Sequence, residues 1–216
     1  MNHRDYKQFA AGECYHIYNR GNAKMDIFRD AQDYQNFLKR LEMVLGLAEP
    51  VEASGRSQRK ALVRLEPLPK GSFSVVSYCL MPNHFHILIK QNGDISISKL
   101  MAKLTTSYAM YFNKKYNRVG GIFQDKFKAV PVDTDQYLQW LSVYIHQNPP
   151  VAGLIEKPED WPWSSYSSCI SNKEDIICDT SIILENYKNS DEYKAFVESS
   201  FDIIKQYKDV DDLLMD

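Results

Sequence analysis

Residues 73–90 read FSVVSYCLMPNHFHILIK, and they predict two neighbouring strands joined by a tight turn. Both halves are rich in β-branched and aromatic residues, which suit a pleated, half-buried surface. The tripeptide Met81-Pro82-Asn83 supplies the turn between them. Because side chains alternate across a strand, His84 and His86 would share one face of the second strand, whereas Phe85 would point to the other.

Helices and strands alternate on both sides of this hairpin. A period of about 3.6 residues marks each helix, and caps or breakers mark its ends. The expected elements, in order, are a strand at 15–20, a helix at 30–47 capped by Asp30, strands at 73–80 and 84–90, a helix from Ser96 or Ser98 to Gly120, a strand at 127–132, and a helix capped by Asp133 that runs to about Gln147.

This order predicts an α+β fold. Its first six elements match the ferredoxin-like βαββαβ unit, an antiparallel sheet backed by two helices. The seventh element would be an added helix lying against the sheet. Residues 50–71, which contain three prolines, predict a long loop or a protruding hairpin. After Trp161-Pro162-Trp163 the chain is polar and predicts helices without a clear second core.

Charge is distributed unevenly, although 26 basic and 28 acidic residues give a net charge of only −2. Residues 172–216 carry 5 Lys against 12 acidic residues, and residues 1–171 carry 21 basic against 16 acidic residues. A basic main domain at 1–171 and an acidic, helical extension at 172–216 are therefore expected. Charge alone is equally consistent with a solvated helix face followed by a solvated tail.

The composition is that of a globular protein, with 44% hydrophobic and 25% charged residues among 216. Whole-chain disorder and a coiled coil are therefore excluded. The longest apolar runs fall far short of the ~18 residues that a membrane span requires. Four cysteines without CxxC spacing favour a reduced, cytoplasmic protein.

The histidine pair could chelate a metal. Two imidazoles on one face of a strand suit a single divalent ion, since imidazole is a versatile ligand. The alternative is that His84 and His86 are simply two exposed residues on a half-buried strand. The HxH pattern by itself does not separate these interpretations.

Tyr144 and Asn148 follow each other by four residues, so they would stack on one helix face if the last turn persists to Asn148. A tyrosine hydroxyl can act as a nucleophile when a bound metal polarises its target. The amide oxygen of Asn148 could complete a metal site with His84 and His86. The alternative is a tyrosine packed in the core with its hydroxyl satisfied.

Several short blocks resemble the single-tyrosine HUH transposases, in particular the REP-associated tyrosine transposase branch and the related IS200-like enzymes. They stand in family order over about residues 14–166. The blocks are YHIYNRGN at 15–22, YCLMPNHFH at 78–86, GGIFQ at 120–124, YIHQNP at 144–149 and WPWSSY at 161–166.

The resemblance implies a metal-dependent DNA endonuclease and strand transferase with Mg²⁺ or Mn²⁺ as its cofactor. It implies that Tyr144 is the nucleophile and that Asn148 completes the metal site of His84 and His86. The substrate would be single-stranded DNA beside a hairpin, cleaved through a 5′-phosphotyrosine. This chain departs from the family pattern in its long connection at 50–71 and in lacking an arginine after Asn148-Pro149.

Basic side chains could follow the DNA backbone. The expected contacts are Arg20, Lys103, Lys114, Lys115, Arg118, Lys126 and Lys128. Two other functions stay open: a domesticated hairpin-binding protein that serves repeat maintenance or regulation, and a metalloenzyme that hydrolyses with water. The residue spacing is compatible with a monomer and with a homodimer.

Overall fold

A four-stranded antiparallel sheet forms the centre of the chain in the computed structural model, which describes residues 8–48, 65–171 and 175–206. The strand order is β2-β3-β1-β4, so β3 and β1 are the inner strands. The strands are β1 Cys14–Arg20, β2 Phe73–Met81, β3 His84–Gln91 and β4 Lys128–Val132. The predicted α+β fold with its βαββαβ order is confirmed.

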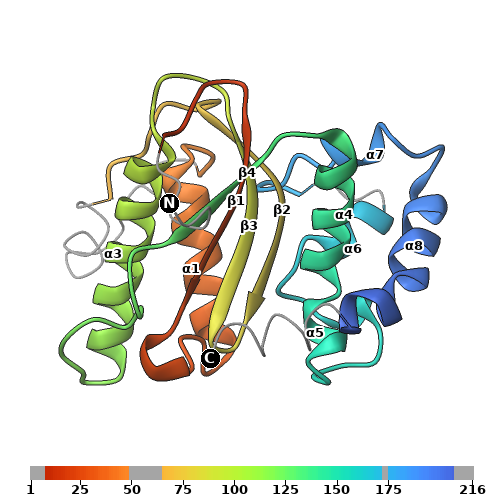
Figure 1. The fold of residues 1–216 in the computed structure, drawn as a ribbon. Helices are drawn as coiled ribbons and strands as arrows, with labels where there is room; N and C mark the ends of the chain where they lie inside the picture. The colour runs from red at the N-terminus through yellow and green to blue at the C-terminus, as the bar shows by residue number, and fades with distance from the viewer. Residues whose placement is uncertain (1–7, 49–64, 172–174, 207–216) are drawn as a thin grey trace.

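The long helices lie on opposite faces of this sheet (Figure 1). Helices α1 Ala31–Val44 and α3 Ile97–Lys115 cover one face, and α4 Asp135–His146 covers the other. The shorter elements are η1 Asn22–Lys24, α5 Asn148–Val151, η2 Pro158–Asp160, α6 Tyr166–Ile170, α7 Ser181–Leu184 and α8 Ser190–Ser199.

Helix caps explain where α1 and α4 begin. The side chain of Asp30 accepts a hydrogen bond from the backbone of Asp33, as the sequence predicted for α1. The prediction that Asp133 caps α4 is wrong by one residue. The hydroxyl of Thr134 accepts from the backbone N–H of Tyr137 at 3.1 Å, because the helix begins one residue later than the sequence predicted.

Each sheet face has its own core. Phe85, Ile87 and Ile89 of β3 pack with α1 and α3, and Leu88 packs with α4. Leu65 and Leu68 also join the α1/α3 core, whereas residues 49–64 of the predicted long connection lie outside the described residues.

The segment after Trp163 contributes more buried side chains than its polar composition predicted. Tyr166, Ile183, Tyr193 and Val197 are all fully buried and belong to the same core as Val143 and Ile145 of α4. The predicted helical tail is confirmed, but the expectation that it lacks a clear second core is wrong. The apolar positions of α7 and α8 are too few to signal burial, because only one side of each short helix is covered.

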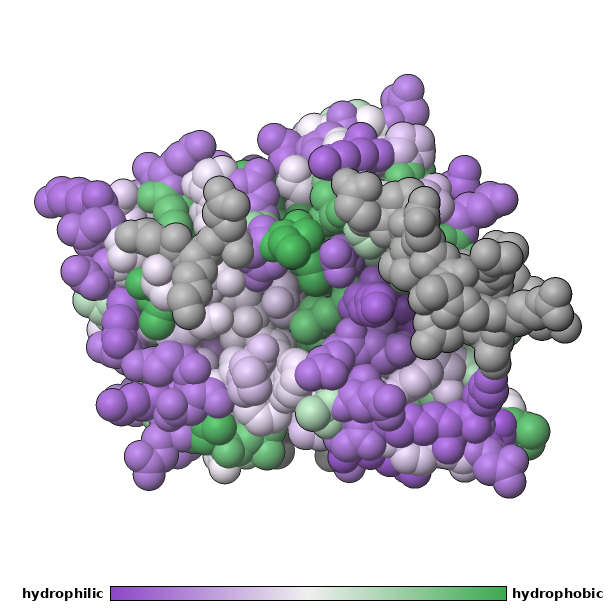
Figure 2. Space-filling view, turned by 180° about the vertical axis from the view of Figure 1, so that it is seen from behind, coloured by the Kyte–Doolittle hydropathy of each residue, from purple (hydrophilic) through white to green (hydrophobic). Residues whose placement is uncertain are grey.

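The surface on the far side of the molecule is mostly hydrophilic, with a small apolar area near its centre (Figure 2). In the described part of the chain, no helix is long and apolar enough to cross a membrane.

Candidate active site

His84 and His86 project from the start of β3 toward the α4 side of the sheet. Phe85 between them is fully buried in the α1/α3 core. The two imidazole rings lie with their centroids 5.0 Å apart. In Figure 1 the C-terminal end of α4 lies at the same end of the sheet as the turn before β3. The alternation of the strand therefore brings both imidazoles to the part of the sheet where α4 ends.

Each histidine of the pair has its Nδ1 engaged by a neighbouring side chain. Nδ1 of His84 lies 2.6 Å from Oδ1 of Asn83 in the β2–β3 turn. Nδ1 of His86 lies 2.9 Å from Nε2 of His16 on β1. An Nδ1–H that donates to such a partner fixes the tautomer and leaves the lone pair on Nε2. The Nε2 atoms are thus the nitrogens suited to metal ligation.

His16 is a site residue that the sequence did not single out. It is buried, with 7% of its surface exposed, and burial lowers its pKa to about 3. A neutral ring with its proton on Nδ1 can accept a hydrogen bond at Nε2 from an Nδ1–H of His86. The one feature of the sequence that pointed to His16 was its spacing of two residues from Tyr18, which puts both side chains on one face of the strand. The antiparallel register that pairs Tyr18 with His86 was not available from one sequence.

Two tyrosines flank the histidines. The ring of Tyr144 is nearly perpendicular to that of His86 at a centroid distance of 5.8 Å, and it lies 6.4 Å from His16. The ring of Tyr18 stacks on His86, also at 5.8 Å. The structure therefore brings Tyr144 and the histidine pair together within one chain. Distance alone does not distinguish Tyr144 from Tyr18.

Asn148 lies beyond the end of α4, because this helix ends at His146 and Asn148 starts α5. Its Nδ2 reaches back to donate to the carbonyl of Tyr144 at 2.8 Å. Its Oδ1 is buried and has no hydrogen-bond partner among the described residues. A buried amide oxygen without a donor is unusual and often indicates an unseen ligand such as a water or an ion.

The described residues contain no group of three or more His, Cys, Asp or Glu side chains that could hold a metal. Two imidazoles and one amide oxygen remain as the donor set. Carbonyl oxygens suit Mg²⁺ and Mn²⁺, and imidazole suits the transition metals. By their donor chemistry, the unpartnered Oδ1 of Asn148 and the adjacent imidazoles of His84 and His86 suit a divalent ion, and they suit Mn²⁺ better than Mg²⁺.

Of the predicted DNA contacts, Arg20 and Lys128 lie on the face that carries the histidines. Arg20 is paired with His84, and Lys128 is paired with Tyr18, in the sheet register. Directly paired residues point to the same face of a sheet. Nε of Arg20 also donates to Oε1 of Gln124 at 3.2 Å. These two cations are thus close to the candidate centre in the sheet.

The other predicted contacts come from α3 and the segment after it. Helix α3 covers the opposite face of the sheet, and it carries Lys103, Lys114 and Lys115. The guanidinium of Arg118 lies 5.9 Å from the ring centroid of Phe112, and Lys126 is exposed in the loop before β4. The structure therefore places the α3 lysines and Arg118 away from the histidines, and it shows no contact between Lys126 and either histidine.

Lys115 is held by carboxylates. Its Nζ lies 2.7 Å from Asp30 and 2.7 Å from Asp33, and the side chain of Asp33 is fully buried. Desolvation lowers the pKa of Lys115, but hydrogen bonds to these two carboxylates outweigh it and raise the pKa. Lys115 of α3 therefore forms ion pairs with the N-cap and the first turn of α1.

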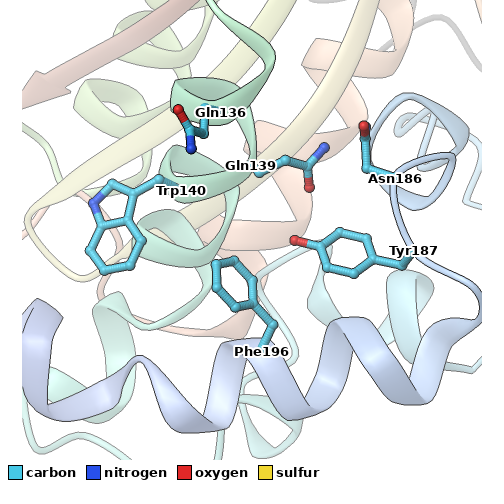
Figure 3. A pocket seen from close by; sticks show the side chains of 6 residues that line it. All are labelled: Gln136, Gln139, Trp140, Asn186, Tyr187 and Phe196. Atoms are coloured by element: carbon cyan, nitrogen blue, oxygen red, sulfur yellow. The ribbon is translucent and has the colours of Figure 1, made fainter.

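A pocket of about 490 Å³ lies where α4 meets the segment of α7 and α8 (Figure 3). The side chains of Gln139, Tyr187 and Phe196 converge on it. None of its lining residues is a histidine or a carboxylate. None of the predicted site residues lines this pocket.

Comparison with known proteins agrees with the motifs. Residues 62–148 match the family described as "Transposase IS200 like". A Haemophilus influenzae protein described as a REP-associated tyrosine transposase is 34% identical over 105 residues, which cover 44% of this chain and 59% of that protein. The chain thus spans somewhat under two thirds of this relative's length.

A solved structure shares the fold. A REP-associated tyrosine transposase bound to a REP hairpin matches with a TM-score of 0.55 and 16% identity, over 82% of this chain and 92% of the other. A second structure, described as a transposase from Deinococcus radiodurans, gives a TM-score of 0.35 at 12% identity, over 64% and 92% of the two chains. The predicted resemblance to these transposases is confirmed.

Proposed function

We propose that this chain, as a relative of the IS200-like transposases, cleaves and rejoins single-stranded DNA beside a hairpin with Tyr144 as its nucleophile. The observation that carries the proposal is the contact of the Tyr144 ring with His86 at 5.8 Å, within one chain. The Tyr144 oxygen would attack the scissile phosphorus and form a 5′-phosphotyrosine. The 3′ oxygen would leave and take up a proton, and attack by a 3′-hydroxyl would reverse the step.

A divalent ion, Mg²⁺ or Mn²⁺, would be held by Nε2 of His84, Nε2 of His86 and Oδ1 of Asn148. The unpartnered Oδ1 and the engaged Nδ1 atoms support this ligand set. When bound, such an ion neutralises charge on the phosphate oxygens and polarises the phosphorus. The hydrogen bond from Asn148 to the Tyr144 carbonyl would keep the ligand and the nucleophile in a fixed relation.

Arg20 and Lys128 are the cations that we propose contact DNA nearest the reaction, because they share the histidine face. Lys103, Lys114, Lys115, Arg118 and Lys126 would at most contact more distant parts of the backbone. A contact to phosphate weakens as salt rises, and each lost contact lowers the slope of the salt dependence by about 1. Arg20→Gln should therefore reduce that slope more than Lys114→Gln.

The active site would be complete in a single chain. Tyr144 contacts the histidines of its own chain, so no partner subunit is required for the nucleophile to reach the metal site. A monomer could then cleave DNA, although two copies could still act together during strand transfer. Mixing Tyr144→Phe chains with His86→Ala chains should therefore not restore cleavage.

The test is a covalent-adduct assay with hairpin DNA that carries single-stranded flanks, in Mg²⁺ or Mn²⁺. The wild-type chain should form an SDS-resistant protein–DNA adduct, and Tyr144→Phe should not. Tyr18→Phe is the matched control, because its ring lies at the same distance from His86 and should leave the adduct intact. His84→Ala and His86→Ala should abolish the adduct but retain hairpin binding.

Other outcomes would overturn the proposal. Hairpin binding without cleavage in either metal would favour a domesticated DNA-binding protein. Cleaved DNA without any adduct would favour hydrolysis by a metal-activated water. An adduct that survives in Tyr144→Phe and disappears in Tyr18→Phe would identify Tyr18 of β1 as the nucleophile.

A further inference from the structure

Four fully buried polar side chains connect α4 to α8 and to the start of α6. Nδ1 of His146 lies 2.7 Å from the hydroxyl of Tyr193, and its Nε2 lies 2.9 Å from Oγ of Ser165. The Tyr193 hydroxyl lies 3.2 Å from Oγ of Ser142. All four residues have an exposed fraction of 0%. No part of the candidate metal site belongs to this group, so its role requires a separate explanation.

A single direction of hydrogen bonds satisfies every member of the group. Ser165 accepts from the backbone N–H of Tyr78 at 2.9 Å, and Ser142 donates to the carbonyl of Gln139 at 2.7 Å. From donor to acceptor the chain runs Tyr78 N–H, Ser165 Oγ–H, His146 Nε2, then His146 Nδ1–H, Tyr193 Oη–H, Ser142 Oγ–H and Gln139 O. Such a continuous chain is cooperative, so losing one member weakens the others.

All members are neutral. In this direction of hydrogen bonds the His146 ring carries a proton on Nδ1 alone, and burial raises the pKa of the Tyr193 hydroxyl well above its ordinary value. The network therefore holds its geometry by directed hydrogen bonds and not by charge. It joins β2, α6, α4 and α8, and none of its side chains is a buried charged group.

The network fixes the turn of α4 that carries Tyr144. His146 is two residues further along, about 200° around the helix, so it faces away from the side that meets His86. Next to it, Nε2 of Gln147 donates to the carbonyl of Val197 in α8 at 2.7 Å. Figure 1 shows α4 between the sheet and α8. A rotation of this turn that moved Tyr144 would therefore also strain the bonds of His146 and Gln147 to α8.

We infer that Tyr193 is a positioning residue: through His146 it holds the Tyr144 turn in the orientation that cleavage requires. This role in cleavage rests on the proposed function, whereas the restraint of α4 does not. Catalysis is sensitive to placement, because a misplacement of 1 Å can lower a rate by about 100-fold. Groups that support a reacting side chain from behind are what secures such placement.

The test compares two buried tyrosines that each lose a hydroxyl. Tyr193→Phe removes the central link of the network. Tyr166→Phe removes a hydroxyl that has no hydrogen-bond partner among the described residues, in the same core. Two quantities are measured in each variant: the rate constant of adduct formation at saturating hairpin DNA and metal, and the amide hydrogen exchange of residues 144–147 relative to β1 and β3.

Tyr193→Phe should lower the rate constant at least about 10-fold and leave the half-saturating DNA concentration unchanged. Exchange at 144–147 should quicken at least about fivefold while the strands stay protected. Tyr166→Phe should change neither quantity. Ser142→Ala, which leaves Tyr193 without its acceptor, should shift both quantities in the same direction by less, and it replaces Tyr193→Phe if that variant does not fold.

The inference is overturned if Tyr193→Phe behaves as Tyr166→Phe does, or if exchange quickens equally across the whole sheet. It is also overturned if exchange at 144–147 quickens while the rate constant stays the same. A wild-type chain that forms no adduct would refute the proposed function instead. The exchange data would then decide alone whether Tyr193 restrains α4.

Discussion

The two faces of the sheet are built from different side chains. The face under α1 and α3 is filled with rings such as Phe28, Phe37, Phe85 and Tyr108, all almost fully buried. The face under α4 buries imidazoles, hydroxyls and amides beside its aliphatic residues. A polar group tolerates burial only where its partners are aligned, so this second face demands exact directions from its neighbours. The first face supplies stability, and the second supplies the candidate chemistry.

The largest effect, on the free energy of unfolding, should come from a cavity in the core under α1 and α3. Phe37→Ala removes a ring that contacts Phe28, Phe85 and Tyr108, and it should lower the free energy of unfolding by about 3–5 kcal/mol. The adduct rate of the folded fraction should stay unchanged. Thermal or urea denaturation measures the first quantity. Met110→Ala, exposed at 54% on α3, is the control and should change little.

A change at His16, on the polar face, should alter the metal requirement of adduct formation. His16→Phe keeps a ring but removes the nitrogen that faces Nδ1 of His86. The metal concentration for half-maximal adduct formation should rise about 10–100-fold, as expected when a group that orients a metal ligand is lost. DNA affinity in EDTA should not change. His16→Gln should recover part of the loss, and an unaltered metal requirement would show that His16 does not orient His86.

The apolar face has an exception, a buried carboxylate: Asp33 of α1 is paired with Lys115 of α3. Lys115→Met should lower the free energy of unfolding by about 1–2 kcal/mol. This is less than for a fully buried pair, because Lys115 is 20% exposed and Tyr116 still donates to Asp33 at 2.7 Å. Hairpin affinity should fall no more than for Lys114→Met. A larger fall specific to Lys115 would support its predicted role as a DNA contact over its structural one.

The smallest effect should come from Tyr166, whose buried hydroxyl lies on the polar face. The Tyr166 hydroxyl is buried without a hydrogen-bond partner among the described residues, and burial raises its pKa. Tyr166→Phe should therefore leave stability unchanged or raise it by up to about 1 kcal/mol. Chemical denaturation measures this. A loss above 1 kcal/mol would mean that the hydroxyl has a partner, such as a bound water.

The same contrast explains how far the sequence could be interpreted. Phe85 between His84 and His86 was assigned to the opposite face by alternation, and the strand and helix order followed from periodicity and caps. His16 and Tyr193 were not recognised, because their partners are 70 and 47 residues away and depend on sheet register and on helix packing. The roles of Tyr144, His84, His86 and Asn148, and the boundary between 171 and 172, stay predictions.

We propose that Tyr144 becomes covalently joined to DNA, and tandem mass spectrometry of the adduct after nuclease and protease digestion would locate the bond. We expect a nucleotide attached through a 5′-phosphate to Tyr144, in the presence of Mn²⁺ or Mg²⁺. A nucleotide attached to Tyr18 or to any other residue, or cleaved DNA with no attached protein, would contradict it.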